Sequence, residues 1–272
     1  MEVHMKLKIA VVQQEGNPGC LELNRANAYE AAKQALAENA DIILFHEEMT
    51  LGYSPLVEEL AEPVDGETTQ GFIQLLQGHD SCIVYGLSER DGDKYYISAP
   101  VVTANGVIAN YRKVHLWHCN PTTDLRHEPT IYTAGDRFVT FRWKGAKIGI
   151  IICYDGDFHE CADVYRRAGC SVVLWMNNRP DCGNGHYVWD HALHNSMYFA
   201  VSCCCGPDEK GEHCPGGSNI TGYDGKPIVE IWDKPGIIYA EIDPDEALAH
   251  RPNNHYVFNR RDDLYYNDDA CI

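Results

Sequence analysis

One cysteine stands where a catalytic nucleophile is commonly placed. Cys153 follows the apolar run 148–152, and a polar stretch, residues 154–157, separates it from an expected helix. A turn at the end of a buried strand projects its side chain outward, and the backbone N–H groups nearby favour a thiolate. Cys153 is therefore a candidate nucleophile; the alternative is an inert thiol at the end of a core strand.

Carboxylates offer the base that a thiol nucleophile needs. Thirteen histidines are present, but none carries a local pattern that ties it to Cys153. Glu47 and Glu48 follow the apolar run 42–45, which we expect to be a parallel strand. Because ligands bind at the carboxyl edge of such strands, one of these acids is a candidate general base. A solvated loop acid is the alternative interpretation.

A lysine could supply a positive charge to the same site. Lys113 lies beside Arg112 in the strand-like stretch 111–116. Neighbouring strand residues point to opposite faces, so one of the two bases points inward, where we expect a carboxylate. An exposed charge on an edge strand is the alternative.

Hydrophobic periodicity indicates the elements that must position these residues. A strand at 7–13, a helix at 24–39 and a strand at 41–45 form a strand–helix–strand opening, which implies parallel pairing. Further strands are expected at 81–87, 94–103, 106–115, 138–143, 147–153, 171–176, 198–203, 217–221, 227–232 and 237–242, and further helices at 68–76, 160–168, 189–196 and 245–250. This order predicts an α/β protein with two mixed sheets and helices on their outer faces. We expect a single domain, residues 1–272, with a polar tail from about residue 251.

The composition disfavours several classes of protein and partner. Apolar residues make up 44% and charged residues 23%, a balance unlike that of disordered, collagen-like or coiled-coil chains. The net charge, 22 − 40 = −18, repels phosphate backbones and anionic membranes, so neither nucleic acid nor a membrane is an expected partner. No apolar run approaches the ~20 residues of a membrane span, and residues 1–10 lack a signal-peptide pattern, which favours the cytoplasm.

Twelve cysteines and a pair of histidines raise the question of metals. The cysteines include the run 203–205 and form no CxxC pair, and most stand in apolar surroundings, so we expect most to be reduced and buried. His191 and His194 can share a helix face, but no spacing supplies a third ligand. We therefore expect neither a metal nor a cofactor.

Three stretches together resemble the nitrilase superfamily of carbon–nitrogen hydrolases. They occur in the order of that family with similar spacings: Phe45-His-Glu-Glu-Met-Thr-Leu-Gly-Tyr53, Tyr111-Arg-Lys-Val-His-Leu116 and Ile151-Ile-Cys-Tyr-Asp155. The opening residues 8–13 and the segment 216–220 are also similar, so the resemblance spans almost the whole chain. Each motif is weak alone, whereas the ordered set is specific.

The resemblance implies a four-layer αββα sandwich, a homo-oligomer (a dimer or larger) and a set of site residues. The catalytic Glu of the family falls on Glu47, five positions before the Gly-Tyr pair, rather than on Glu48. The catalytic Lys falls on Lys113 and the nucleophile on Cys153. A second Glu, in the loop before the strand that leads to the nucleophile, matches Glu128; an exposed loop acid is the alternative there.

These residues would hydrolyse an amide without a histidine as general base. Glu47 would act as general base toward Cys153 or water, because burial can raise the pKa of a carboxyl group toward neutrality. Lys113 and the backbone N–H of Tyr154 would stabilise the oxyanion. Asn178 follows a strand that we expect beside the strand of Cys153, and it is a candidate substrate contact or else a turn former.

The expected function is hydrolysis of a small linear amide to a carboxylic acid and ammonia or an amine, through a thioester. A nitrilase acting through a thioimidate and an N-carbamoyl amino acid amidohydrolase are alternatives within the family. The Tyr-Asp pair after Cys153 favours an amidase, because many nitrilases have Trp-Glu there. A catalytically inactive binding protein is a further alternative, against which the presence of Glu, Lys and Cys argues. We expect loops 55–64, 117–127 and 180–187 to select the small-molecule amide or nitrile substrate.

Overall fold

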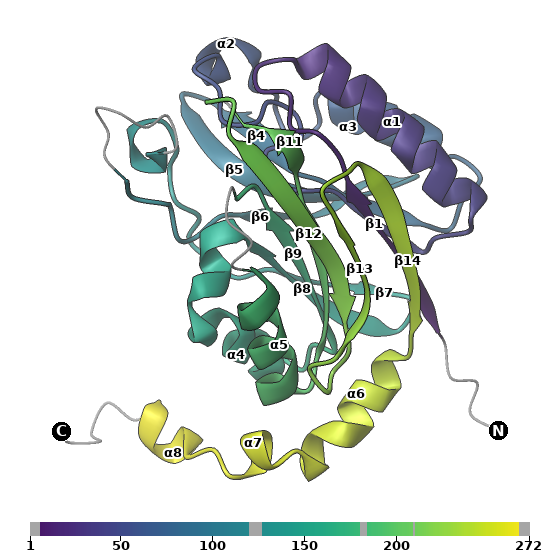
Figure 1. Cartoon of the computed structure of the whole chain (residues 1–272), viewed down its shortest axis with the longest axis vertical. Coiled ribbons are helices and arrows are strands. Elements are labelled where there is room, and N and C mark those ends of the chain that lie inside the picture. The colour runs from purple at the N-terminus through teal and green to yellow at the C-terminus, as the bar shows by residue number, and fades with distance from the viewer. Residues whose placement is uncertain (1–5, 120–126, 180–183, 209, 267–272) are drawn as a thin grey trace.

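Two mixed β-sheets of seven strands each form the centre of the molecule (Figure 1). The computed structural model describes residues 6–119, 127–179, 184–208 and 210–266. The first sheet has the order β14-β1-β2-β3-β5-β4, with β6 paired to β5. Its strands are β1 Leu7–Gln13, β2 Ile42–Leu44, β3 Cys82–Val84, β4 Leu87–Asp91, β5 Lys94–Thr103, β6 Gly106–Arg112 and β14 Gly236–Ile242.

The second sheet has the order β11-β12-β10-β9-β8-β7, with β13 paired to β12. Its strands are β7 Thr140–Trp143, β8 Ala146–Ile152, β9 Val172–Asn177, β10 Tyr198–Cys203, β11 Cys205–Pro207, β12 His213–Thr221 and β13 Pro227–Trp232. Parallel pairing is confined to β1-β2-β3 in the first sheet and β8-β9-β10 in the second, and the other named strand pairs are antiparallel. The parallel opening that the sequence predicts is confirmed.

Helices cover the outer faces of both sheets (Figure 1). The α-helices are α1 Leu21–Ala37, α2 Val57–Leu60, α3 Glu67–Leu75, α4 His159–Arg167, α5 Asn184–Asn195, α6 Pro244–His250, α7 His255–Phe258 and α8 Asp262–Tyr265. The 3-10 turns are η1 Glu128–Thr130, η2 Cys153–Asp157 and η3 Arg251–Asn253. Helices α1 and α3 lie on the first sheet and α4 and α5 on the second, so the predicted αββα sandwich is confirmed. The polar segment from residue 251 onward contains η3, α7 and α8.

Strand alternation explains the four layers. In β1, Leu7, Ile9 and Val11 point into the core between the sheets, whereas Ala10 and Val12 pack toward α1 and α3. In β8, Ile150 and Ile152 face the central core and Ile151 packs toward α4 and α5. Because both faces of these strands are covered, their central residues, 9–12 and 148–152, form continuous apolar runs. Full burial of one such side chain contributes roughly 1.5–3 kcal/mol.

The end of β3 differs from the sequence prediction. The strand expected at 81–87 stops at Val84, and a separate strand, β4, begins at Leu87. Gly86 lies between them, directly against the turn that follows β2: a Cβ there would be 2.3 Å from the carbonyl oxygen of His46 and 2.4 Å from the amide nitrogen of Glu48. Only glycine permits this close approach. The close contact anchors the turn that carries Glu47.

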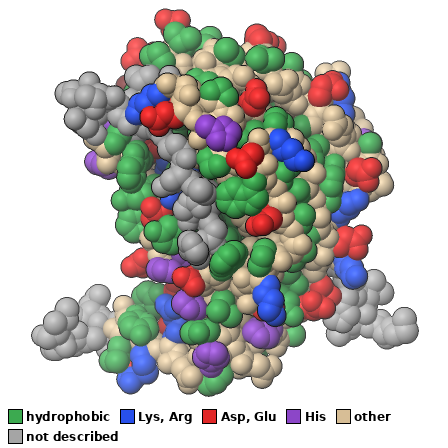
Figure 2. Space-filling view, in the orientation of Figure 1, with side chains coloured by type: hydrophobic (Ala, Val, Ile, Leu, Met, Phe, Trp, Pro, Cys, Tyr) green, Lys and Arg blue, Asp and Glu red, His purple; other side chains and the backbone are tan. Residues whose placement is uncertain are grey.

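The surface reflects the composition of the chain. Figure 2 shows acidic side chains spread over the visible face among basic and apolar ones. Among the helices of the described residues, none is long and apolar enough to span a membrane.

Candidate active site

The Cys153 turn joins β8 to α4 and has an unusual backbone. Cys153 has a φ of +45°, in the left-handed region that costs a non-glycine residue on the order of 1 kcal/mol. Two interior side chains hold the turn: Trp175 Nε1 donates to the Cys153 carbonyl at 3.1 Å, and His191 Nε2 donates to the Gly156 carbonyl at 2.7 Å. A Cβ on Gly156 would lie 2.1 Å from the Trp175 ring, so this position requires glycine.

Glu47 reaches the same place from the first sheet. It follows β2, and its side chain is fully buried. Its Oε1 accepts a hydrogen bond from Lys113 Nζ at 2.7 Å, and its Oε2 accepts one from the backbone N–H of Asn178 at 3.0 Å. The Cys153 side chain is a further hydrogen-bond partner of this carboxyl group. Glu47 therefore lies between the nucleophile candidate and the cation.

Lys113 is shared between two carboxylates. Its Nζ also donates to Oε1 of Glu128 at 2.6 Å, and both side chains are fully buried. Glu128, at the start of η1, accepts further hydrogen bonds from the hydroxyl of Tyr53 and the backbone N–H of Trp117, each at 2.8 Å. The exposed loop acid that was the alternative for Glu128 is wrong, as is the exposed strand charge for Lys113. The neighbouring Arg112 points outward, as strand alternation predicts, and pairs with Glu89.

Burial dominates the electrostatics of this cluster. It raises the pKa of Glu47, and the Lys113 ammonium opposes that rise only in part. Burial alone would lower the pKa of Lys113, but the carboxylates of Glu128 and Glu47 hold it well above its usual value. Lys113 is therefore a permanent cation, and Glu47 is a carboxyl group poised to exchange a proton.

The thiol is neutral in this environment. Burial, followed by the charge of Glu47, raises the pKa of Cys153 to about 12, while Lys113 and Arg179 lower it. Cys153 retains only 7% of its surface exposure. Since so little thiolate exists at neutral pH, attack by this sulfur requires a base in contact with it. Glu47 is in that position.

Glu48 lies in a separate environment. Its Oε2 accepts hydrogen bonds from Ser88 at 2.5 Å and from Tyr132 at 3.0 Å. Burial raises its pKa to about 8, so it is predominantly protonated at neutral pH. The structure thus separates the two neighbouring acids that the sequence offers as bases.

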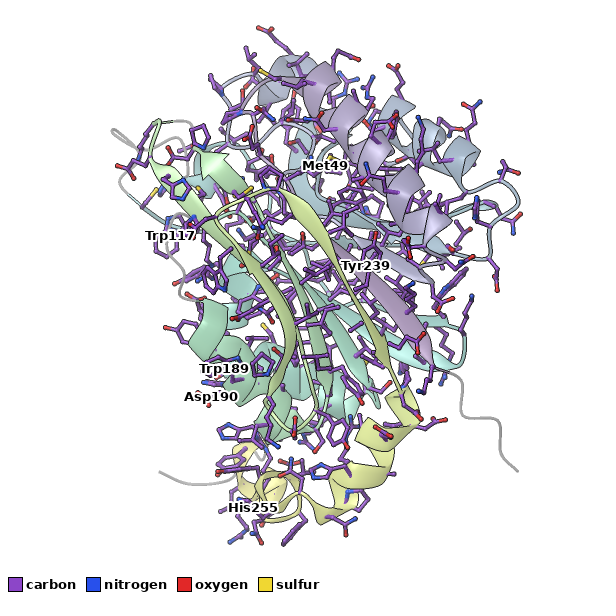
Figure 3. All side chains as sticks on the ribbon, turned by 45° about the vertical axis from the view of Figure 1, so that its right-hand side comes forward. Met49, Trp117, Trp189, Asp190, Tyr239 and His255 are labelled. Atoms are coloured by element: carbon purple, nitrogen blue, oxygen red, sulfur yellow. The ribbon has the colours of Figure 1, made fainter. Side chains whose placement is uncertain are left out.

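Asn178 and Tyr154 border the cluster. The backbone of Asn178 is held by Glu47, and its Oδ1 accepts a hydrogen bond from Cys204 Sγ at 2.7 Å. The Tyr154 ring packs edge-on against Trp117, with ring centroids 4.8 Å apart. Figure 3 places Trp117 at the edge of the molecule, well away from Trp189 and Asp190 on α5. Of the expected specificity loops, residues 120–126 and 180–183 lie outside the described residues.

Three groups of the metal-ligating kind lie together beside this turn. Ligand atoms of His115, Asp155 and Cys161 fall within 4.8 Å of one another. The Asp155 carboxylate, however, already accepts hydrogen bonds on both oxygens from protein donors. His191, one of the paired histidines, is committed to the carbonyl of Gly156.

The cysteine run is buried, as expected. Cys203, Cys204 and Cys205 are each at most 2% exposed. Most of the cysteines that the structure describes are buried.

Arg179 and Asp155 are site residues that sequence reasoning missed. The Arg179 side chain is 11% exposed, interacts with the Cys153 thiol and pairs with Asp157. A cation two residues after the parallel strand β9 was the available signal, but the sequence before Pro180 is also typical of a turn. Asp155 is the last residue of the motif around Cys153, yet no local pattern predicts its buried contacts.

Comparison with known proteins identifies the family of the chain. The model of the carbon–nitrogen hydrolase family matches residues 8–251. The chain belongs to the carbon–nitrogen hydrolase family. The predicted resemblance to the nitrilase superfamily is confirmed, and so is the prediction of an amidase-type hydrolase.

Relatives of this carbon–nitrogen hydrolase match over most of their lengths. It is 28% identical to an (R)-stereoselective amidase of a Pseudomonas species, across 94% of this chain and 92% of that protein. It is 26% identical to the omega-amidase NIT2 of Homo sapiens, across 89% of this chain and 91% of that protein.

Solved structures share the fold of this carbon–nitrogen hydrolase. A CN-hydrolase superfamily protein of Xanthomonas campestris superposes with a TM-score of 0.84 at 23% identity, over 94% of this chain and 97% of that one. An amidase variant of Nesterenkonia sp. AN1 superposes with a TM-score of 0.82 at 21% identity, over 98% of both chains. In that structure the acetamide moiety of fluoroacetamide is covalently attached at the active site cysteine.

Proposed function

We propose that the protein hydrolyses a small linear amide to a carboxylic acid and ammonia or an amine through a thioester on Cys153. The observation that carries this proposal is the buried network in which Lys113 Nζ lies 2.7 Å from Glu47 and 2.6 Å from Glu128, with Glu47 in contact with Cys153. The amidase and omega-amidase activities named for relatives favour an amide as substrate.

In the first half-reaction, Glu47 takes the proton of the Cys153 thiol while the sulfur attacks the amide carbonyl carbon. The carbonyl oxygen becomes an oxyanion, which Lys113 and the backbone N–H of Tyr154 stabilise. When the intermediate collapses, the C–N bond breaks, and Glu47 returns its proton to the leaving nitrogen. Ammonia or an amine departs, and the acyl group remains on sulfur as a thioester.

In the second half-reaction, Glu47 takes a proton from water, and the resulting hydroxide adds to the thioester carbonyl. The same donors stabilise the second oxyanion. Collapse breaks the C–S bond, and the sulfur recovers a proton from Glu47, so the enzyme is regenerated. Glu128 keeps the ammonium of Lys113 in place throughout, because it accepts a second hydrogen bond from Nζ.

Two measurements test this proposal: the rate of turnover of a panel of substrates, and the mass of the acyl-enzyme intermediate. Ammonia release is measured from aliphatic amides, ω-amides, N-carbamoyl amino acids and nitriles. Intact-mass spectrometry with the best substrate is expected to show one acyl adduct, on Cys153 and on none of the other cysteines. The Cys153→Ala variant is expected to fold and to lose turnover. More than a few per cent of residual activity in that variant would exclude Cys153 as the nucleophile, and turnover of nitriles alone would exclude an amidase.

A further inference from the structure

We propose that Asp155 is a positioning residue that fixes the Cys153 turn against the segment carrying Lys113. The inference deepens the proposed function, because it rests on the roles given there to these two side chains. Asp155 is fully buried and stands two residues after Cys153.

The four hydrogen bonds of Asp155 reach two separate segments. Its Oδ2 accepts from the backbone N–H of Ile152 at 3.0 Å and from the hydroxyl of Tyr111 at 2.7 Å. Its Oδ1 accepts from the backbone N–H of His115 at 2.9 Å and lies 2.9 Å from Nδ1 of the same residue. One carboxylate therefore ties the end of β8 to the end of β6.

The residues that Asp155 binds are neighbours in sequence of both Cys153 and Lys113. Ile152 directly precedes Cys153, whereas Tyr111 and His115 flank Lys113, two residues to either side. Strands β8 and β6 belong to different sheets, so no ladder of backbone hydrogen bonds joins them. Asp155 supplies that connection at the point where the distance between sulfur and ammonium must be set.

The backbone of Cys153 makes such a connection necessary. A φ of +45° is unfavourable for cysteine, so the turn persists only where its surroundings hold it. A displacement of ~1 Å between reacting groups can lower a rate by about a hundredfold. Loss of the connection would therefore affect catalysis more than it affects binding of the substrate.

Asp155→Asn is the informative substitution. Each carboxylate oxygen accepts from one backbone N–H, and a backbone N–H cannot reverse its polarity. The amide nitrogen of asparagine must take one of the two oxygen positions. There its N–H group would face the backbone N–H of Ile152 or of His115, and two donors cannot form a hydrogen bond. The variant therefore breaks either the tie to Ile152 or the tie to His115, with almost no change in volume.

We expect kcat of the folded Asp155→Asn enzyme to fall at least about tenfold, with KM changed by less than about threefold. Alkylation of Cys153 by iodoacetamide, measured without substrate, is expected to slow as well. Asp163→Asn is the matched control, because Asp163 is a buried carboxylate on α4 that pairs with Arg166. It is expected to lower stability and leave kcat and alkylation unchanged. A folded Asp155→Asn enzyme with wild-type kcat and alkylation would overturn the proposal.

Tyr111→Phe is the conservative variant. It removes one side-chain donor and leaves both backbone ties of Asp155 in place. We expect kcat to stay within about threefold of the wild-type value. A tenfold loss would show that the backbone ties do not suffice, contrary to the proposal.

Amide hydrogen exchange of the unaltered protein gives a test that does not depend on whether a variant folds. The N–H groups of Ile152 and His115 are expected to exchange as slowly as those within β8. Rapid exchange at both would show that the ties are not maintained, and would overturn the proposal. Retained turnover in Cys153→Ala would refute the proposed function instead. Amide exchange in the unaltered protein and the alkylation rate of Asp155→Asn test the role of Asp155 without any turnover.

Discussion

The carboxylates of Glu47 and Glu48, adjacent in sequence, lie in two separate hydrogen-bond networks. Glu47 contacts Lys113, and Glu48 accepts hydrogen bonds from Ser88 and Tyr132. Glu48 has a φ of +54°, a left-handed conformation that turns the chain sharply between the two side chains. The two acids therefore have different tasks, and substitutions at these positions can tell them apart.

Glu47→Gln is expected to lower kcat/KM by ~10²–10⁴, because the amide cannot accept the proton of the Cys153 thiol. Glu48→Gln makes the same chemical change one residue away and serves as the control. It is expected to retain activity within about threefold. Steady-state rates on one amide substrate decide the matter, and the reverse ranking would show that Glu48 is the base.

Glu48→Gln is also expected to change how stability depends on pH. The pKa of Glu48 is raised to about 8 by burial, so the folded protein keeps this proton while the unfolded chain releases it above about pH 4.5. The stabilisation from the neutral form is complete below pH 4.5 and is lost progressively as the pH rises to about 8. Glutamine does not ionise, so its contribution to stability does not change with pH. The free energy of unfolding of the variant, relative to that of the wild type, therefore rises by roughly 2–4 kcal/mol between pH 4.5 and 8. Urea unfolding at both pH values measures this difference; a difference that does not change with pH would contradict it.

Lys113→Arg is expected to lose at least ~10²–10³ in rate although the charge is kept. The ammonium lies between Glu47 and Glu128 as a compact donor, whereas a planar guanidinium cannot occupy the same point. Lys144→Arg provides the control, because Lys144 is a partly buried lysine paired with Asp41 and is expected to tolerate the change.

Lys113→Ala is expected to lose more activity, since it leaves two buried acids without their cation. Burial already raises the pKa of Glu47, and removal of the ammonium that opposes this rise shifts it further upward. The acidic limb of the residual rate profile therefore moves to higher pH, because a protonated Glu47 cannot act as base. Near wild-type turnover in Lys113→Arg would instead make Lys113 a dispensable charge.

Arg179→Met is expected to slow alkylation of Cys153 at neutral pH by at least about threefold. Burial raises the pKa of this thiol, and the Arg179 guanidinium is one of two cations that lower it. Methionine keeps a long side chain but removes the charge. Arg137→Met is the control, because Arg137 is an exposed arginine that pairs only with its neighbour Asp136 among the ion pairs of the described residues. Equal alkylation rates in the two variants would exclude an effect of Arg179 on the thiol.

Residue types and local order determined much of this protein. Continuous apolar runs predict β1, β2 and β8, because strands covered on both faces have no polar side. The ordered motifs around Glu47, Lys113 and Cys153 predict the family, and alternation correctly separates Lys113 from Arg112. These features depend on residues close in sequence, which is why the sequence alone carries them.

Other features were decided only when the two sheets packed together. Glu47 and Asn178 are 131 positions apart, and their hydrogen bond exists because the ends of β2 and β9 meet. The strain at Cys153, and the buried position of Arg179 beside it, follow from the same packing. Glu48 and Asp155 are ordinary acids by local pattern, and burial gave the first its raised pKa and the second its four donors. Hydration and charge at a site depend on everything packed around it, so they belong to the tertiary structure rather than to any one segment of sequence.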